Sequence, residues 1–338
     1  MKKTLGFYLF IVTAFICAGF FSACQRQQRP AAEAEVFNLR LAHLSPETEV
    51  YHTSSVKFKE LIEERSNGRI NVTIFPAGQL GYDREIIESL QLGVIDLGVV
   101  TTAPLANFAP AFGVFDLPWI FRDWDHVESV IRQPFIQDLY ATAFDRGLVV
   151  MAMLPRGFRN TTNSIRPLNS ADDFRGIRMR VLESPIYVNT FEALGANVTA
   201  MSWGEVFTAL QQGAIDAVEQ PNSALFNERI FEVQSYLTFT EHIFAFASFA
   251  ASRSLYDRLP GDLQELMREC AVEALYLTGV QARLEGDSFG QRLQDMGMIA
   301  NHIDKVNLRR LVQRTYDDFI SRSDQQTIEF LNHIERTN

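Results

Sequence analysis

From residue 37 onward, stretches in which apolar and polar side chains alternate are separated by stretches with helical spacing of apolar residues. Alternation is typical of strands that bury one face, and recurrence every three or four residues is typical of amphipathic helices. The amino half follows this order. Strands are predicted over residues 38–44, 69–75 and 94–100, and helices over residues 84–92 and over a segment that includes residues 56–62 and stops near residue 68. Strands and helices that alternate at this spacing predict an α/β fold with a mostly parallel sheet.

One heptapeptide occurs twice in related form. LQLGVID at residues 90–96 is matched by LQQGAID at residues 210–216, 120 positions later. In both copies a predicted helix ends at glycine and a strand follows. A Ser-Pro step after a strand also recurs, at residues 45–46 and 184–185. Two landmarks in the same order indicate two lobes of similar topology.

The carboxyl-terminal third begins with a helical pattern from residue 260 to about residue 296. This is long for a globular helix, and a helix of that length could brace both lobes. Gly279, Gly286 and Gly290 leave a kink or break open. Cys270 falls among the apolar positions of this pattern, which predicts a small core residue.

The first residues have the features of an export signal. Lys2 and Lys3 precede an apolar run over residues 5–23, which ends at Cys24. Residues 1–23 resemble a bacterial lipoprotein signal with FSAC as its lipobox, although Phe21 stands where leucine is preferred. Cys24 is then the lipidated residue, and residues 24–35 form a tether. Two alternatives stay open: the run remains as a transmembrane anchor, or cleavage occurs after residues 32–34.

Composition narrows the classes of function. The net charge of −10 argues against a nucleic-acid partner, which requires a broad basic surface. The six histidines show no pair with metal-ligand spacing and no glycine-rich phosphate loop is present, so we expect no metal and no cofactor. Residues 286–290 match the nucleophile-elbow pattern of hydrolases, but that motif requires a strand before the serine. Helical sequence lies on both sides here, which argues against it.

Six arginines lie between residues 156 and 180 in this acidic chain. We expect four of them to be solvated surface charges: Arg156, Arg166, Arg175 and Arg178. Arg180 differs, because it lies on a predicted strand that leads into the Ser-Pro helix start. Ligands bind at the carboxyl ends of strands in α/β sheets, and helix N-termini favour anions. A second helix start follows at Ser202, with capping-box spacing to Glu205. Arg180 is therefore the predicted centre of an anion site.

Six motifs carry a family resemblance that extends from residue 37 to the carboxyl terminus. They are GFRNTT (157–162), GIRMRV (176–181) and LQQGAID (210–216), with SNGRI (66–70), FPAGQLG (75–81) and LPWIFRD (117–123) in the amino half. Together they resemble the solute-binding proteins of tripartite ATP-independent periplasmic (TRAP) transporters. The resemblance implies a two-lobed clamshell fold that encloses an organic acid and delivers it to a membrane permease.

The resemblance also implies site residues. Arg180 falls at the position that pairs with the ligand carboxylate, and Arg159 at a second arginine that often reaches the cleft. Gln220 occupies the place of a polar residue that bonds the carboxylate, and Trp203 an aromatic cleft position. No catalytic residue is implied.

Two departures from the family pattern bear on the ligand. Thr101 stands where binders of sugar acids carry glutamate, which disfavours a polyhydroxylated sugar acid. Glu183 places negative charge near Arg180, which favours a monoanionic ligand over one with several carboxylates. Equally, Glu183 can stabilise the following helix N-terminus.

We therefore predict a periplasmic, lipid-anchored solute-binding protein without enzymatic activity. Lobe I is expected to contain residues 36–155 and about 246–285, and lobe II residues 156–245 and about 286–338. Two alternatives remain on the same scaffold: a hydrolase or lyase with a carboxylate substrate, and a ligand sensor.

Overall fold

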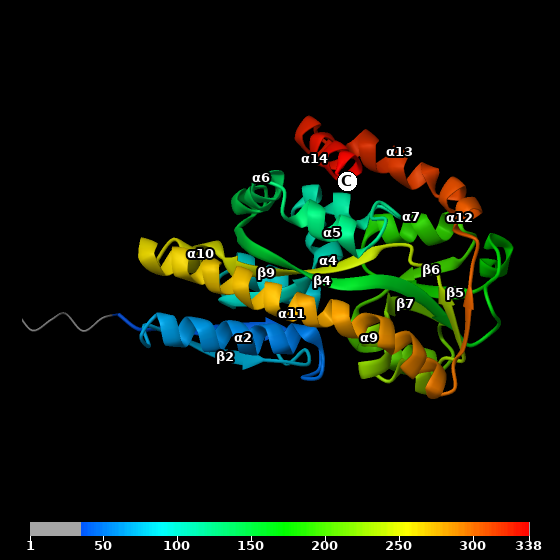
Figure 1. Cartoon of the computed structure of the whole chain (residues 1–338), viewed down its shortest axis with the longest axis horizontal. Helices are drawn as coiled ribbons and strands as arrows, with labels where there is room; N and C mark the ends of the chain where they lie inside the picture. The colour runs from blue at the N-terminus through cyan, green and yellow to red at the C-terminus, as the bar shows by residue number, and fades with distance from the viewer. Residues whose placement is uncertain (1–34, 338) are drawn as a thin grey trace, which may run out of the picture. The chain divides into compact units, whose positions relative to one another are not determined.

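The computed structural model describes residues 35–337, in which strands and helices alternate as predicted (Figure 1). The predicted signal, Cys24 and residues 25–34 lie outside the described residues. The strands are β1 (Phe37–His43), β2 (Ile70–Phe75), β3 (Leu97–Thr101), β4 (Leu148–Asn163), β5 (Arg178–Val181), β6 (Asn197–Ala200), β7 (Ala217–Pro221), β8 (Tyr236–Phe239), β9 (Phe244–Ser252) and β10 (Ile299–His302).

The helices account for most of the remaining chain. They are α2 (Val50–Arg65), α3 (Asp83–Gln91), α4 (Thr102–Leu105), α5 (Trp124–Ile131), α6 (Phe135–Ala141), α7 (Pro185–Ala193), α8 (Val206–Gln211), α9 (Asn222–Asn227), α10 (Arg253–Tyr256), α11 (Gly261–Asp295), α12 (Lys305–Leu311), α13 (Gln313–Arg322) and α14 (Gln325–Arg336), with short 3₁₀ turns η1 (Pro110–Asp116), η2 (Phe144–Arg146), η3 (Ala171–Phe174), η4 (Trp203–Glu205) and η5 (Ile230–Glu232). None of the described helices has the length and apolarity needed to cross a membrane.

The sheet consists of two parallel parts joined by two long strands. Its order is β2-β1-β3-β9-β4-β7-β5-β6. Strands β1, β2 and β3 are parallel in one part, which we call lobe I, and β5, β6 and β7 are parallel in the other, lobe II. Strands β4 and β9 run antiparallel to each other and to the neighbouring lobe strands. The prediction of a mostly parallel sheet therefore holds within the lobes and is wrong at their junction.

The repeated heptapeptide builds the same turn in each lobe. Gly93 and Gly213 both adopt positive φ after a helix, at +70° and +65°, a conformation that glycine adopts without steric cost. Asp96 accepts the backbone N–H of Arg40 at 2.8 Å, and Asp216 accepts that of Arg178 at 2.9 Å. Each aspartate thus ties the strand that follows it to the first strand of its lobe. The two lobes therefore share this contact at the position of the repeated heptapeptide.

Apolar side chains cover both faces of the sheet. In lobe I, one core lies under α2 and the first half of α11, and the other under α3, α5 and α6. In lobe II, Met179 and Val181 pack with α7 on one face, while Val218 packs with α8 and α9 on the other. Phe244 and Phe246 of β9 join one lobe I core and Phe249 the other, so all three are core residues.

The predicted long helix is α11, which spans 35 residues. It packs against α2 of lobe I and α9 of lobe II, and Figure 1 shows it running across both parts of the sheet. Cys270 is fully buried on this helix, as predicted. Residues 286–290 lie inside α11, so the serine of the hydrolase pattern does not follow a strand.

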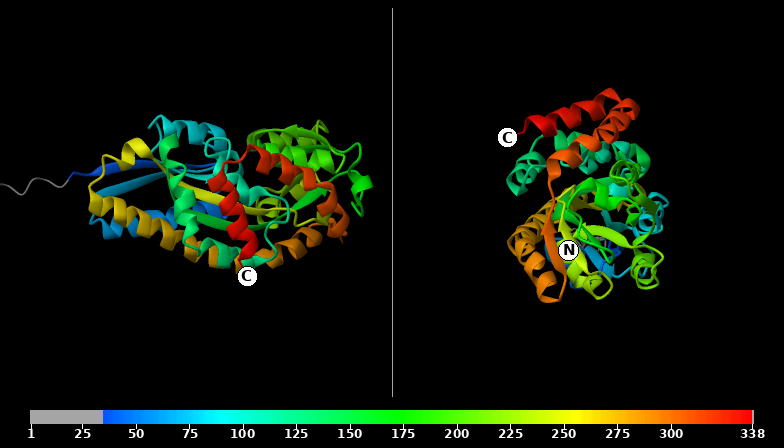
Figure 2. Two further views of the ribbon diagram at one scale, coloured as in Figure 1. Left: turned by 90° about the horizontal axis from the view of Figure 1, so that it is seen from above. Right: turned by 90° about the vertical axis from the view of Figure 1, so that its right-hand side faces the viewer.

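The Ser-Pro steps follow strands in both lobes. Residues 45–46 lie between β1 and α2, which begins at Val50, and Ser184 precedes α7, with Pro185 as the first helical residue. The capping box predicted at Ser202 is wrong: Ser202 makes no side-chain cap, and the chain enters a short 3₁₀ turn before α8 begins at Val206. The carboxyl-terminal α14 is the last red helix in Figure 2, and its Phe330, Leu331 and Ile334 pack into a lobe I core.

Candidate ligand-binding cleft

Arg180 lies near the end of β5 with its side chain turned into the protein. It is 1% exposed, although its neighbour Arg178 on the same strand is exposed. Its guanidinium donates through Nε and one terminal nitrogen to the carbonyl oxygen of Met201, at 2.9 and 2.6 Å. The other terminal nitrogen is buried and has no hydrogen-bond partner in the described part of the chain. The buried guanidinium of Arg180 therefore has one terminal nitrogen available to donate a further hydrogen bond.

No carboxylate in residues 35–337 forms an ion pair with Arg180. Burial lowers the pKa of Arg180 to about 10, although more distant acids, Glu219 first among them, oppose this shift. The guanidinium still carries its charge at neutral pH. A buried charge without a partner is unfavourable, and an anionic ligand would supply that partner.

Trp203 connects Arg180 to an acidic side chain. The guanidinium carbon of Arg180 lies 5.2 Å from the centre of the Trp203 ring, within the range of a cation–π contact. The indole N–H donates to the Glu228 carboxylate, at the end of α9. Burial raises the pKa of Glu228 to about 7. Glu228 was not predicted from the sequence, where it follows α9 without a recognisable motif.

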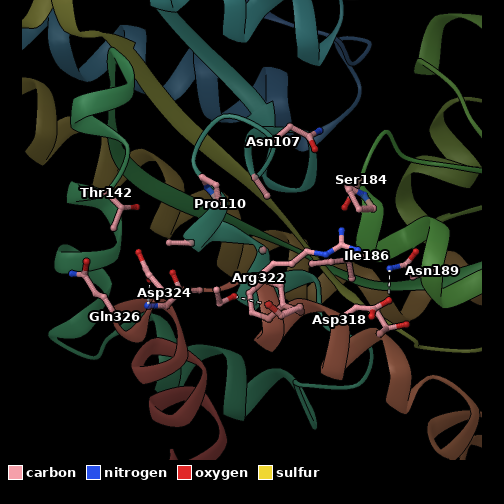
Figure 3. A pocket seen from close by; sticks show the side chains of 18 of the residues that line it. Asn107, Pro110, Thr142, Ser184, Ile186, Asn189, Asp318, Arg322, Asp324 and Gln326 are labelled. Atoms are coloured by element: carbon pink, nitrogen blue, oxygen red, sulfur yellow. Dashed lines mark hydrogen bonds between the residues drawn. The ribbon is translucent and has the colours of Figure 1, made fainter.

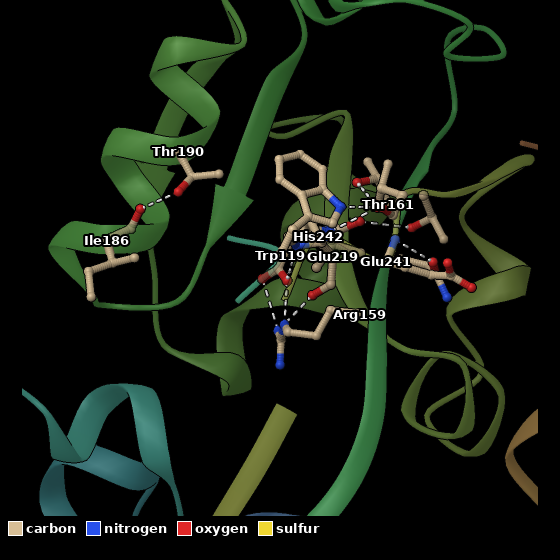
Figure 4. Close-up of polar contacts among 12 residues, drawn as sticks. Trp119, Arg159, Thr161, Ile186, Thr190, Glu219, Glu241 and His242 are labelled. Atoms are coloured by element: carbon tan, nitrogen blue, oxygen red, sulfur yellow. Dashed lines mark hydrogen bonds and ion pairs between the residues drawn. The ribbon is translucent and has the colours of Figure 1, made fainter. Parts of the chain in front are cut away.

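Arg159 is fully buried in β4 and is already neutralised. It donates through Nε and a terminal nitrogen to the carboxylate of Glu219 on β7, and also to that residue's carbonyl oxygen (Figure 4). Burial alone would raise the pKa of Glu219, but Arg159 and a hydrogen bond from His242 hold it below its ordinary value. Burial also lowers the pKa of His242, so it is neutral and donates through Nε2 at 3.2 Å. One terminal nitrogen of Arg159 has no hydrogen-bond partner among residues 35–337.

Gln220 lies beside Glu219 on β7, next to β4. It is 6% exposed, and its side-chain oxygen is buried with no partner among the described residues. Pairing between β4 and β7 sets Gln220 opposite Asn160, one residue from Arg159. Gln220 therefore offers a buried acceptor on the strand that also carries Glu219, the partner of Arg159.

Thr101 is buried at the end of β3 in lobe I. Its hydroxyl bonds to the Tyr51 hydroxyl at 2.8 Å, and its backbone N–H donates to Asp83 at 2.8 Å. Burial raises the pKa of Asp83 to about 6, with Arg156 and Arg180 among the groups that oppose this shift. The hydroxyl of Thr101 is therefore already engaged within lobe I.

Arg156 was predicted to be a solvated charge, and this is wrong. It is 7% exposed, and it donates to Glu49 at 3.2 Å while its guanidinium lies 4.6 Å from the centre of the Tyr51 ring. Arg166 is half-buried, and Arg175 and Arg178 are exposed. The partner Glu49 precedes Arg156 by 107 residues, so no local pattern could indicate the pair.

Glu183 lies in the segment between β5 and α7 and is half-buried. Its backbone oxygen accepts a hydrogen bond from Asn107 of the α4–η1 segment at 2.6 Å. It is also one of the acids that raise the pKa of Arg180. Its carboxylate is therefore close enough to act on Arg180 without pairing with it.

The two lobes touch at further points around these residues. Asn227 of lobe II donates to Glu49 of lobe I at 2.7 Å. Gly204 of η4 lies so close to Tyr82 that a Cβ added there would overlap the tyrosine ring. Two segments of lobe II, at Asn227 and at Gly204, therefore contact lobe I.

A separate cavity of about 600 Å³ lies between the α4–η1 segment, the start of α7 and helices α13 and α14 (Figure 3). Asn107, Asn189 and Arg322 are among the residues that line it. Its lining includes none of Arg159, Arg180, Trp203 or Gln220. The cavity is therefore distinct from the predicted carboxylate site.

Comparisons with known proteins agree with this architecture. A solute-binding protein from Verminephrobacter eiseniae is 34% identical over 252 residues, which cover 74% of this chain and 75% of the relative. The C4-dicarboxylate-binding periplasmic protein DctP of Rhodobacter capsulatus is 31% identical, covering 80% and 81%.

A solved structure shows the same fold. The crystal structure of a TRAP periplasmic solute-binding protein from Bordetella, with density interpreted as pantoate, superposes with a TM-score of 0.85 at 30% identity. It covers 89% of this chain and 99% of the other. The family model for bacterial extracellular solute-binding proteins, family 7, matches residues 41–323. This chain therefore belongs to family 7 of the bacterial extracellular solute-binding proteins.

Proposed function

We propose that this chain binds a monoanionic organic acid between its lobes, with the ligand carboxylate on Arg180, and delivers it to the permease of a TRAP transporter. The observation that carries the proposal is the buried guanidinium of Arg180, which has a carbonyl but no carboxylate as partner within residues 35–337. A carboxylate that enters a closed cleft loses its hydration and needs such a partner.

The remaining site residues have supporting roles in this proposal. Trp203 forms the wall beside the guanidinium, and Gln220 and Arg159 each offer one unpaired polar atom. Thr101 presents a hydroxyl from lobe I. The Bordetella protein with pantoate and the Rhodobacter relative named for C4-dicarboxylates both support a carboxylate ligand. Glu183 restricts the choice to one negative charge, because a second carboxylate near it would be repelled.

The protein holds its ligand without transforming it. Contacts from both lobes stabilise the closed form, and the difference in ligand affinity between open and closed forms drives closure. The closed form is then what the permease recognises. We expect the purified protein to release its ligand chemically unchanged, as mass spectrometry of ligand extracted from it would show.

Isothermal titration with the ligand so identified tests Arg180. Removing one partner of a buried charge pair costs about 3–5 kcal/mol, so Arg180→Ala should weaken binding roughly 10²- to 10⁴-fold. Arg180→Lys should retain only part of the affinity that Arg180→Ala loses, because an ammonium lacks the forked geometry of a guanidinium. Arg175→Ala is the matched control, since its ion pair with Asp172 is solvent-exposed. Wild-type affinity in Arg180→Ala would refute the site.

Glu183→Gln tests the charge of the ligand in the same titration. The variant should leave the affinity for a monoacid nearly unchanged and increase that for the corresponding diacid, because the repelling charge is gone. Equal effects on both acids would show that Glu183 acts on the α7 N-terminus instead.

We further propose that Cys24 is lipidated and anchors the protein to a membrane on its periplasmic side. The residues that support this are the apolar run 5–23 and the small residues before the cysteine. The full-length protein should partition with membranes, and Cys24→Ala should remain unprocessed or be released. Mature wild-type protein that begins at Glu35 and carries no lipid would contradict the anchor.

A further inference from the structure

Glu228 is an acidic residue beside the carboxylate site, at the carboxyl end of α9. Its carboxylate accepts the indole N–H of Trp203, and the guanidinium carbon of Arg180 lies 5.2 Å from the centre of the same ring. Glu228 therefore acts on Arg180 through Trp203. A second negative charge near the place of an anion is unfavourable by Coulomb's law. Attraction of the anion therefore does not account for Glu228.

The turn that carries Trp203 also holds Arg180 by its backbone. The carbonyl oxygen of Met201 accepts both hydrogen bonds from Arg180, two residues before the indole. Met201 and Trp203 are only partly buried where they pack on the lobe II core. Among the described residues, the bond to Glu228 is the one hydrogen bond that a side chain of residues 201–205 makes. The place of the ring on Arg180 therefore depends on this acceptor.

The fold fixes where the Glu228 carboxylate lies. Its backbone N–H donates to the carbonyl oxygen of Ala224 at 3.0 Å, and Leu225 of the same helix is fully buried in the lobe II core. The preceding residue, Asn227, donates to Glu49 of lobe I at 2.7 Å. The end of α9 is therefore anchored on both lobes, and the fold itself holds the acceptor in position.

The contact with the indole does not require a charge on Glu228. Burial raises the pKa of Glu228 to about 7, although the indole hydrogen bond opposes this shift. Glu49 adds to the rise, whereas Arg156 and Arg180 lower the pKa. The carboxylate and the protonated carboxyl both have an oxygen that accepts an N–H. A glutamine would keep that acceptor without a charge, whereas a leucine would remove it.

We propose that Glu228 is a positioning residue of the carboxylate site, which holds the Trp203 ring on the Arg180 guanidinium through the indole hydrogen bond. The proposal rests on Arg180 as the partner of the organic acid and assigns Glu228 no contact with the acid. A half-buried N–H that loses its acceptor is unfavourable, so without Glu228 the ring should turn away. Met201 alone would then orient the guanidinium.

Nuclear magnetic resonance of the full-length chain tests the contact in the absence of any ligand. With isotope-labelled tryptophan and arginine, the signals to follow are the Trp203 indole N–H and the Arg180 Nε–H, assigned from Trp203→Phe and Arg180→Lys. Glu228→Leu should shift the indole signal and remove the ring-current shift of Arg180. Glu228→Gln should retain both signals. The indole signals of Trp119 and Trp124 should stay in place and show that each variant is folded.

Glu205→Leu is the matched control. Glu205 is exposed in the same turn, and the indole N–H donates to Glu228 and not to it. This variant removes a negative charge two residues from Trp203 and should leave both signals unchanged.

Titration with the acid extracted from the wild-type protein measures the consequence for binding. Glu228→Leu should weaken its affinity about tenfold, the equivalent of one hydrogen bond to a charged group. Glu228→Gln and Glu205→Leu should not weaken it.

Three results would overturn the positioning role. Unchanged Trp203 and Arg180 signals in Glu228→Leu would show that the ring stays in place without the bond. Equal effects of Glu228→Gln and Glu228→Leu would show that the charge acts and not the acceptor. Wild-type affinity in Glu228→Leu would show that binding does not need the ring to be held. Wild-type affinity in Arg180→Ala would instead overturn the proposed function, and the signals of the ligand-free protein distinguish the two failures.

Discussion

Asp116 is a buried carboxyl whose ionisation is opposed by its surroundings. It is 4% exposed at the end of η1, and burial raises its pKa to about 8, although Arg159 acts in the other direction. One of its oxygens has no partner among the described residues. At neutral pH the carboxyl is therefore largely protonated in the folded protein and ionised in the unfolded chain.

This difference predicts a pH dependence of stability. Between about pH 4 and pH 8 the folded state holds one more proton at Asp116 than the unfolded state, so this group lowers the free energy of unfolding as pH rises. Asp116→Asn removes the titrating carboxyl. The difference in free energy of unfolding between the variant and wild type should therefore shift in favour of the variant as the pH rises from 5 to 8. Urea unfolding at the two pH values measures the change. A variant–wild-type difference that is the same at both would contradict a protonated Asp116.

At the residue scale, sequence reasoning depends on local patterns. Arg180 could be singled out because the strand that carries it and the following Ser-Pro step are both local, and the structure shows that strand as β5 with Arg180 buried. Its role as the carboxylate site stays a prediction. Arg156 could not be singled out, because its burial depends on Glu49 and Tyr51, which come from the start of α2. Its place in a run of arginines indicated a solvent-exposed side chain, whereas the fold buries Arg156 in an ion pair with Glu49.

At the scale of elements, the aspartate of the repeated heptapeptide should stabilise both lobes in the same way, because in each lobe it accepts a backbone N–H of a neighbouring strand. Asp216 accepts both the backbone N–H and the guanidinium of Arg178, whose side chain is 49% exposed. The hydrogen bond from Arg178 lowers the pKa of Asp216, so its contribution is present above the ordinary aspartate range and is lost as pH falls through the lowered value.

Alanine variants separate the two contacts. Asp216→Ala should lower the free energy of unfolding by about 1–3 kcal/mol, because a strand N–H loses its acceptor, and Asp96→Ala should do likewise in lobe I. Arg178→Ala should cost less than about 1 kcal/mol, since only a half-exposed ion pair is lost. Chemical unfolding at neutral pH measures all three. If Arg178→Ala costs as much as Asp216→Ala, the ion pair and not the backbone contact ties these strands.

Elements also show where patterns mislead. The spacing from Ser202 to Glu205 is that of a capping box, but the chain forms η4 there, which places Trp203 over Arg180. The long helical pattern, by contrast, continues through Gly286 and Gly290, and at Gly290 the helix lies against Asn222 and Phe239 of lobe II.

For the whole molecule, two lobes could be predicted from the repeat, but not how the sheet passes between them. Strand β4 pairs with β9 in its first part and with β7 and β8 in its second. Such register depends on partners far apart in sequence. The placement of α14 on a lobe I core depends in the same way on tertiary contacts. Under the proposed closure, strands β4 and β9 are the segments about which the lobes would rotate.

Gly204 and Tyr82 offer a test of closure at this scale. They come from lobe II and lobe I, and a side chain at Gly204 would overlap the tyrosine ring in this structure. Gly204 does not have the positive φ that favours glycine, so a larger residue is excluded by the neighbouring lobe and not by its own backbone. Gly204→Val should therefore leave the free energy of unfolding nearly unchanged while it raises the cost of closing.

The expected result is a loss of ligand affinity of about tenfold or more, because a ligand that binds the closed form is weakened by whatever disfavours that form. Tyr82→Ala removes the obstructing ring and keeps the backbone N–H that bonds to Glu85, so it should restore affinity in the double variant. Isothermal titration gives the affinities, and small-angle scattering with and without ligand shows whether Gly204→Val alone stays expanded. If the valine variant binds like wild type, or if Tyr82→Ala brings no recovery, the ligand does not require this contact to close.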